Sequence, residues 1–224
     1  MARVPRHLLV DLGSTNHCTW RSHNSTQVFE LDAAKQLFLD LVGKYAGRHG
    51  IQVRSYCLMG THPHMVVVAT KGQAEFSRFW QVVNHLFARW YNRRHKSRRG
   101  QVVTQRMKSP MIQPGASGRH VLTVMRYGDF NPVRAGMVHS PKDYRWSSYM
   151  HYAFGKSDPL IDDEPEYLAL GHTPRQRMEA YRQLFALPLT SSLRMRRPDI
   201  VEGLFYGDPD WVERHAPRSI GPPS

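Results

Sequence analysis

Apolar and polar positions alternate along roughly the first 155 residues in two kinds of segment. Short β-branched runs predict strands, and apolar residues spaced three or four apart predict helices. The expected elements are, in order, a strand at Asn16–Ser22, a helix at Leu31–His49, strands at Gln52–Met59 and His62–Thr70, a helix at Glu75–His95, a strand at Thr104–Gln113 and a helix at Ser117–Asn131. This order is typical of the ferredoxin-like (RNA-recognition-like) α+β fold, an antiparallel sheet with helices on one face.

Two features predict where elements end. Gly50 is expected to stop the first helix. The last helix is expected to end at Asn131, because the residue before a proline disfavours helical backbone and Pro132 follows.

The chain changes character near residue 158. The segment Asp158–Glu166 is acidic, contains no Lys or Arg, and is interrupted by two prolines. We therefore predict a first domain at residues 1–157 and a C-terminal extension at 158–224. That extension is expected to be partly helical, at Pro174–Ala186, with a flexible tail.

Composition narrows the class of protein. The 224 residues carry 31 Lys and Arg against 18 Asp and Glu, a formal charge of +13, which favours nucleic acid as a partner ahead of a membrane surface. No apolar run approaches the roughly 18 residues that span a bilayer, and we expect no signal peptide. The two cysteines cannot form a disulfide framework. A cytoplasmic, nucleoid-associated location is expected.

The positive charge is concentrated in one segment. No Asp or Glu occurs from Phe76 to Gly128, and Trp90 and Tyr91 are interleaved with basic residues. Phosphate contacts with an aromatic platform suit single-stranded nucleic acid. The alternative is a solvated helix face with two core aromatics, although such faces usually mix charges. The candidate DNA-binding residues are Arg89, Arg93, Arg94, Lys96, Arg98, Arg99, Arg106 and Lys108.

The triplet His62-Pro63-His64 lies in a predicted strand. Successive strand residues point to opposite faces, so both imidazoles are expected on the same face. Two neutral imidazoles can hold a divalent metal together with a third ligand. Taken alone, such a triplet is more often incidental or structural.

Tyr127 and Asn131 lie one helical turn apart, which places them on the same face of the predicted helix. A tyrosine beside a metal is a candidate nucleophile for a phosphodiester, and Asn131 offers a carbonyl oxygen to the metal. On spacing alone the alternative is favoured: Tyr127 as a core aromatic and Asn131 as a helix cap.

Several segments resemble a known family in order and spacing. They are His17–Arg21, Tyr56–Val67, Trp90–His95, Gln105–Lys108, Arg126–Val138 and Asp143–Tyr149. Across roughly residues 5–155 the chain resembles the single-tyrosine HUH transposases, specifically the REP-associated tyrosine transposases. The stretch Tyr167–Gly171 is similar to an extension that many members carry.

The resemblance implies metal-dependent cleavage and rejoining of single-stranded DNA next to a REP-like hairpin, through a covalent 5′-phosphotyrosine. By motif position it implies that His62 and His64 are the metal-binding pair, Asn131 the third ligand and Tyr127 the nucleophile, with Mg²⁺ or Mn²⁺ as cofactor.

The sequence departs from the family pattern at three places. Pro63 replaces a larger hydrophobe, Gly60-Thr61 stands where Pro-Asn is common, and Gly128-Asp129-Phe130 follows the nucleophile where hydrophobic or aromatic residues are usual. Gly128 costs helix stability of about 1 kcal/mol relative to alanine, and Asp129 adds an acidic side chain near the nucleophile.

Two other interpretations stay open. One is a non-cleaving regulatory protein, derived from such a transposase, that binds structured DNA or RNA; Pro63 and Gly128 would support it. The other is a basic regulatory protein that uses the histidine pair for structural zinc. The oligomeric state is left open between a monomer and a homodimer.

Overall fold

The computed structural model describes residues 5–95, 100–104, 106–115, 118–186 and 197–216. Its centre is a five-stranded sheet in the order β2-β3-β1-β4-β5. The strands are β1 Ser14–Thr19, β2 Ile51–Leu58, β3 Pro63–Ala69, β4 Met111–Ile112 and β5 Phe205–Tyr206. The first four pair antiparallel, in the ferredoxin-like order, while β5 is parallel to β4. The predicted α+β fold is confirmed.

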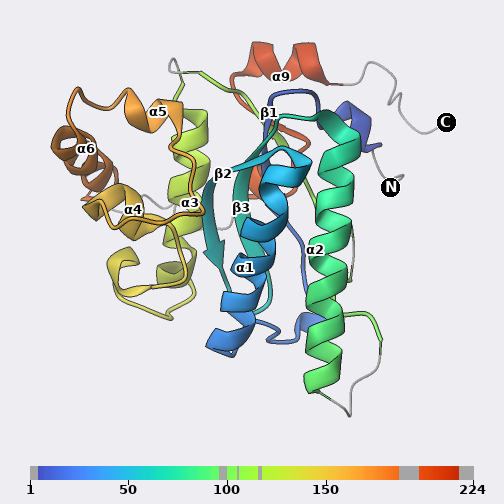
Figure 1. Ribbon diagram of the computed structural model, residues 1–224. Helices are drawn as coiled ribbons and strands as arrows, with labels where there is room; N and C mark the ends of the chain where they lie inside the picture. The colour runs from blue at the N-terminus through green and yellow to red at the C-terminus, as the bar shows by residue number, and fades with distance from the viewer. Residues whose placement is uncertain (1–4, 96–99, 105, 116–117, 187–196, 217–224) are drawn as a thin grey trace.

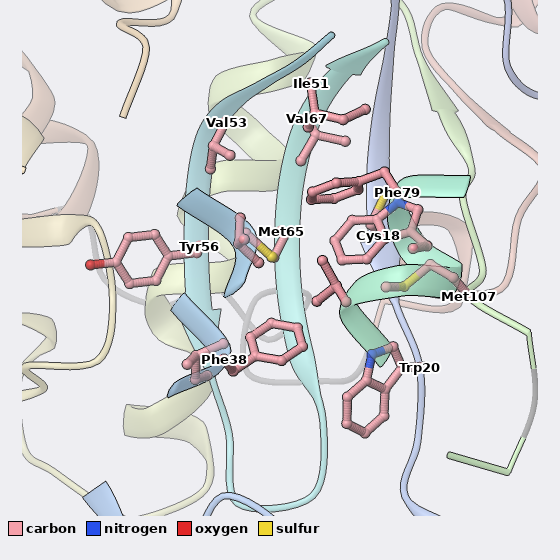
Figure 2. Close-up of a cluster of buried hydrophobic side chains, with 14 of the residues drawn as sticks. Cys18, Trp20, Phe38, Ile51, Val53, Tyr56, Met65, Val67, Phe79 and Met107 are labelled. Atoms are coloured by element: carbon pink, nitrogen blue, oxygen red, sulfur yellow. The ribbon is translucent and has the colours of Figure 1, made fainter. Parts of the chain in front are cut away.

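Two long helices cover one face of the sheet (Figure 1), α1 Asp32–His49 and α2 Gly72–Arg94. As predicted, Gly50 ends α1: its φ is 63°, and its N–H bonds to the Ala46 carbonyl. Beneath these helices lies the larger hydrophobic core (Figure 2), where Cys18 and Met65 from the strands meet Phe38 and Phe79 from the helices.

A second group of helices covers the opposite face of the sheet. It includes α3 His120–Arg134, α4 Tyr149–Phe154, α5 Pro165–Leu168 and α6 Pro174–Ala186. The Glu166 carboxylate accepts the Val121 and Leu122 N–H groups, which fixes the start of α3. The predicted helix at Pro174–Ala186 is confirmed. The two helices expected on one face of the sheet are thus present, and later helices cover the other face.

The predicted end of α3 at Asn131 is wrong, because the helix continues through Pro132 to Arg134. A proline removes its own N–H from the ladder, and its ring crowds the carbonyl of the residue four positions earlier. Two donors at the end of the helix keep their partners: Ala135 bonds to the Asn131 carbonyl and Gly136 to that of Val133. The last turn is therefore intact, and Asn131 is inside the helix instead of capping it.

The predicted strand at Thr104–Gln113 is also too long. Only Met111–Ile112 forms a strand, and isolated bridges join Lys108 to Thr19 and Val103 to Ser22. Pro110 interrupts the ladder because it has no N–H to donate, although its carbonyl accepts from His17.

The acidic segment packs against the sheet, and part of the later chain joins it. Asp162 exchanges hydrogen bonds with the backbone of Val53 on β2, and the Tyr56 hydroxyl donates to Asp158 at 2.6 Å. Further along lie α8 Pro198–Val201, β5 and α9 Pro209–His215. A domain division at residue 158 stays a prediction, but β5 shows that the later chain adds a strand to the sheet. Residues 217–224, which hold most of the predicted tail, are outside the described residues.

Candidate active site

A cavity of about 560 Å³ opens between the α3 side of the sheet and the segment that leads to β4. The catalytic and metal candidates predicted from the sequence all reach it, although they come from different parts of the chain. Its wall includes His62, His64, Tyr127, Asn131, Arg106 and Lys108, together with Arg21 and Arg134. The structure therefore brings the predicted residues together in one pocket.

The two histidines lie side by side, as their spacing predicts. Their ring centroids are 4.8 Å apart at an interplanar angle of 72°. His62 directly precedes β3 and its Nδ1 lies 2.7 Å from the Thr61 hydroxyl, whereas His64 is within β3 and buried.

His64 is held by a second buried histidine. Its Nδ1 lies 2.9 Å from Nε2 of His17 on β1, and the two rings are nearly coplanar, 5° apart. Burial lowers the pKa of His17 to about 4 and the pKa of His64 well below its usual value. Both rings are therefore neutral at physiological pH, the form that binds metals.

Tyr127 lies beside the histidine pair. Its ring meets the His64 ring edge to face, with centroids 5.9 Å apart, and only 3% of the residue is exposed. Its place on α3, which packs against β2 and β3, explains the contact. The predicted nucleophile and the predicted metal-binding pair are thus neighbours.

Arg134 covers the ring of Tyr127. Its guanidinium carbon lies 3.9 Å from the centre of the Tyr127 ring, and one of its nitrogens donates to the Tyr127 carbonyl at 3.2 Å. The two residues are seven positions apart, so they share a helix face with Asn131. Arg134 is a site residue that the sequence analysis missed; its helical spacing would have indicated it, had the helix not been expected to end at Asn131.

The side-chain oxygen of Asn131 accepts a hydrogen bond from the Arg134 guanidinium. Two neutral imidazoles and an amide oxygen are a donor set that suits a divalent cation. Among the described residues, no group of three or more His, Cys, Asp or Glu could hold a metal. In the structure the Asn131 side-chain oxygen is engaged by Arg134.

Asp129 points away from the pocket. It is 1% exposed, accepts a hydrogen bond of 2.8 Å from Tyr181 on α6, and burial raises its pKa to about 8. It is therefore largely protonated at neutral pH. The negative charge expected near the nucleophile is absent, because the side chain is neutral and faces α6. At Gly128 a Cβ would meet no atom within 4 Å.

The predicted DNA-binding residues lie in two places. Arg106 and Lys108 line the pocket, whereas Arg89, Arg93 and Arg94 are exposed near the end of α2. That end is tied to the segment beside the pocket, since Asn92 donates to the Gly100 carbonyl at 2.9 Å and Val103 bridges to Ser22. Lys96, Arg98 and Arg99 lie outside the described residues.

The aromatic platform expected on α2 is largely absent. Tyr91 is buried in the core, and Trp90 is only partly exposed and packs against the same core. The helical period explains this result, because apolar residues spaced three or four apart turn toward the sheet. The arginines Arg89, Arg93 and Arg94 stay exposed on this helix.

Comparisons with known proteins concern the sequence pattern and the fold. Residues 13–108 match the family model described as "Transposase IS200 like". A solved REP-associated tyrosine transposase bound to a REP hairpin matches with a TM-score of 0.54 and 20% identity, over 72% of this chain and 94% of that chain. A putative transposase from Deinococcus radiodurans matches with a TM-score of 0.37 and 16% identity, over 57% of this chain and 95% of that one. No curated protein matches.

The segment 13–108 therefore carries the sequence pattern of the IS200-like transposases. Over most of its length the chain has the fold of a REP-associated tyrosine transposase, and the resemblance expected from the motifs is confirmed. The matched segment contains both histidines but ends before α3, so it includes neither Tyr127 nor Asn131. Among the described residues, no helix is both long and apolar enough to cross a membrane.

Proposed function

We propose that this protein is a metal-dependent single-stranded DNA endonuclease and strand transferase that acts next to hairpins through a covalent link to Tyr127. The observation that carries the proposal is the grouping of His62, His64, Tyr127 and Asn131 around one pocket. The hairpin as substrate is supported by the structural neighbour, which is bound to a REP hairpin.

The proposed reaction is a transesterification. The Tyr127 phenol oxygen attacks the scissile phosphorus, a new phosphorus–oxygen bond forms, and the bond to the 3′ oxygen of the leaving strand breaks. The phenol loses one proton and the 3′ oxygen takes one up, so the step needs no net proton. The DNA 5′-phosphate stays on the protein, and attack by another 3′-hydroxyl reverses the step.

Arg134 is placed to assist this nucleophile. A guanidinium against the Tyr127 ring offers several donors to the phosphate that the phenol would attack. Arg134 is buried enough that desolvation lowers its pKa, while the neighbouring Tyr127 opposes that shift. Its charge therefore acts where water screens it only partly.

His62, His64 and Asn131 would hold a divalent cation, Mg²⁺ or Mn²⁺. When bound, such a cation polarises the scissile phosphate and orients it. Arg106 and Lys108 in the pocket wall contact phosphates beside the cleavage point. Arg89, Arg93 and Arg94 on α2 hold the strand further out, without sequence preference.

The test is a covalent adduct that survives denaturation. Hairpin DNA labelled downstream of the cleavage point is incubated with the protein and Mn²⁺, and the protein is then denatured and separated. Wild type is expected to carry the label and Tyr127→Phe to carry none, because that change removes only the nucleophilic hydroxyl. Tyr149→Phe is the matched control, since Tyr149 is also buried but lies on α4 outside the pocket. Cleavage without an adduct would refute the proposal.

One observation favours a second function, a non-cleaving protein that binds structured DNA. Arg134 engages the Asn131 oxygen, which is the predicted third metal ligand. If this contact persists on DNA, the metal site stays incomplete. Tight hairpin binding with no adduct and no Mn²⁺ affinity is the outcome that would identify the binding protein.

A further inference from the structure

Two consecutive hydrogen bonds connect the C-terminal part of the protein to the candidate metal site. Nδ1 of His17 lies 3.1 Å from the backbone carbonyl of Ile200, which belongs to α8. Nε2 of His17 lies 2.9 Å from Nδ1 of His64. All of these groups are buried, with His17 1%, Ile200 1% and His64 4% exposed. Val201, the next residue of α8, forms part of the pocket wall.

When both imidazole rings are neutral, the protons in these two hydrogen bonds can have only one arrangement. A carbonyl oxygen accepts but cannot donate, so Nδ1 of His17 carries the proton. A neutral imidazole has one ring proton, and Nε2 of His17 therefore presents a lone pair. The bond at 2.9 Å then takes its proton from Nδ1 of His64. Nε2 of His64 is left with the lone pair that a metal requires.

The backbone explains why the two rings meet in this orientation. In the β1–β3 register His17 pairs with Val66 and Thr19 with His64, so the histidines are diagonal neighbours on the same face of the sheet. Ring planes 5° apart bring the two nitrogens edge to edge. A metal-binding histidine usually donates its other N–H to a carboxylate or a carbonyl. Here a second histidine stands between His64 and the carbonyl.

We propose that α8 fixes the tautomer and ring orientation of His64 through His17, so that His17 is a positioning residue of the metal site and α8 is part of that site. The proposal rests on the proposed function, in which His64 is a metal ligand. It assigns a role to a segment well beyond the region that matches the transposase family model, which ends at residue 108.

The first experiment needs no metal and no DNA. Two-bond ¹H–¹⁵N correlation spectra of the full chain, labelled at histidine and kept in EDTA, report which ring nitrogen carries the proton. His64 and His17 are both expected as single Nδ1-protonated tautomers. In His17→Leu, His64 should lose this signature, whereas His17→Gln supplies an amide N–H for Ile200 and an oxygen for His64 and should restore it. An Nε2-protonated His64 in wild type would overturn the proposal, even if Mn²⁺ binds normally.

The second experiment measures Mn²⁺ affinity by calorimetry on the same variants. His17→Leu is expected to weaken binding roughly 10- to 100-fold, the usual effect of losing such a partner, and His17→Gln should recover most of it. Ile112→Ala is the matched control, because it loosens the hydrophobic packing on the same face of the sheet while both histidine rings are kept. Equal weakening in the control and in His17→Leu would show a packing effect and overturn the positioning role. If the wild-type protein binds no Mn²⁺, the proposed function is refuted. The tautomer spectra still show in that case whether His17 fixes the tautomer of His64.

Discussion

The guanidinium carbon of Arg134 lies 3.9 Å from the centre of the Tyr127 ring. The same guanidinium donates to the Tyr127 carbonyl and to the Asn131 side-chain oxygen. One cation thus joins the predicted nucleophile to the predicted third metal ligand, all on a single face of α3. This arrangement depends on the helix continuing past Pro132, which adds the turn that carries Arg134.

Replacing Arg134 is expected to slow adduct formation much more than it weakens DNA binding. Arg134→Gln removes the charge beside Tyr127 and the donors that it offers to the phosphate, and loss of one such transition-state contact typically costs about 10²- to 10³-fold in rate. Arg134→Lys should recover little, because a lysine cannot reproduce the planar stack or the paired donors. Single-turnover adduct formation with labelled hairpin DNA measures the effect. Arg145→Gln is the control, since Arg145 is exposed and stacks on Trp146 outside the pocket. Equal rates for the two glutamine variants would contradict the role of Arg134.

Alanine at either His62 or His64 is expected to remove most Mn²⁺ binding and all adduct formation while the fold is retained. Each substitution takes away one of two neutral imidazoles in the pocket. Calorimetry with Mn²⁺ gives the affinity, and far-ultraviolet circular dichroism checks the fold. His139→Ala, at a position outside the pocket, serves as the control. Unchanged affinity in both pocket variants would show that the metal binds elsewhere.

Neutralising Arg89, Arg93 and Arg94 together should weaken binding of every single-stranded DNA to a similar degree. For single-stranded DNA, the logarithm of the binding constant falls linearly with the logarithm of the salt concentration, and each lost phosphate contact makes this slope shallower by about 0.7. The triple glutamine variant should therefore have a slope shallower by about 2. Adduct yield at saturating DNA should stay near that of wild type, because these residues lie outside the pocket. Fluorescence titrations at several salt concentrations test this, and a slope equal to wild type would show that the helix face is only solvated.

Gly128→Ala is expected to stabilise the protein by about 0.5–1 kcal/mol. The new methyl group has open space, and alanine loses less backbone entropy than glycine when a helix forms. Gly136→Ala is the informative contrast: it also has open space, but its φ of +67° strains any residue with a Cβ. Urea unfolding should therefore move the two variants in opposite directions. A destabilised Gly128→Ala would reveal a hidden packing constraint next to Tyr127.

Asp129 should make the metal-free protein less stable as the pH rises from 7 to 8. Its pKa is about 8 when folded, against an ordinary value of 3.8, so the folded state holds the proton that the unfolded state has lost. Stability then falls with pH, by about 1 kcal/mol over this unit. The measurement is the free energy of unfolding in urea, with EDTA present, for wild type and Asp129→Asn at each pH. The difference between the two proteins isolates the contribution of Asp129, because the other titrating groups contribute equally to both. The variant should lack this decline, and parallel curves would contradict the assignment.

Local periodicity was enough to predict part of the site. A two-residue spacing brings His62 and His64 together, and a four-residue spacing does the same for Tyr127 and Asn131, because these relationships depend only on backbone geometry. The order of strands and helices likewise predicted the ferredoxin-like arrangement.

The remaining site residues depend on contacts between distant segments. His17 and Ile200 are 183 positions apart, and no local pattern connects them. Asp129 was expected to carry charge into the site, but its environment is set by Tyr181 on another helix. Helical spacing could have predicted that Arg134 shares a face with Tyr127 and Asn131. The prediction was not made because prolines usually end helices, and the helix was therefore expected to stop before Pro132. Tertiary packing outweighed the local preference at Pro132.

The segments that flank the sheet also restrict how copies of this chain can associate. Along β2, the backbone of Val53, Tyr56 and Leu58 is engaged by Asp162, Ser148 and Trp146, and on the other side β4 is paired with β5. Exposed strand edges are the usual place where two sheets merge into one. Here the chain has filled these positions with its own later segments. A second copy that extended the sheet at β2 would first have to displace them.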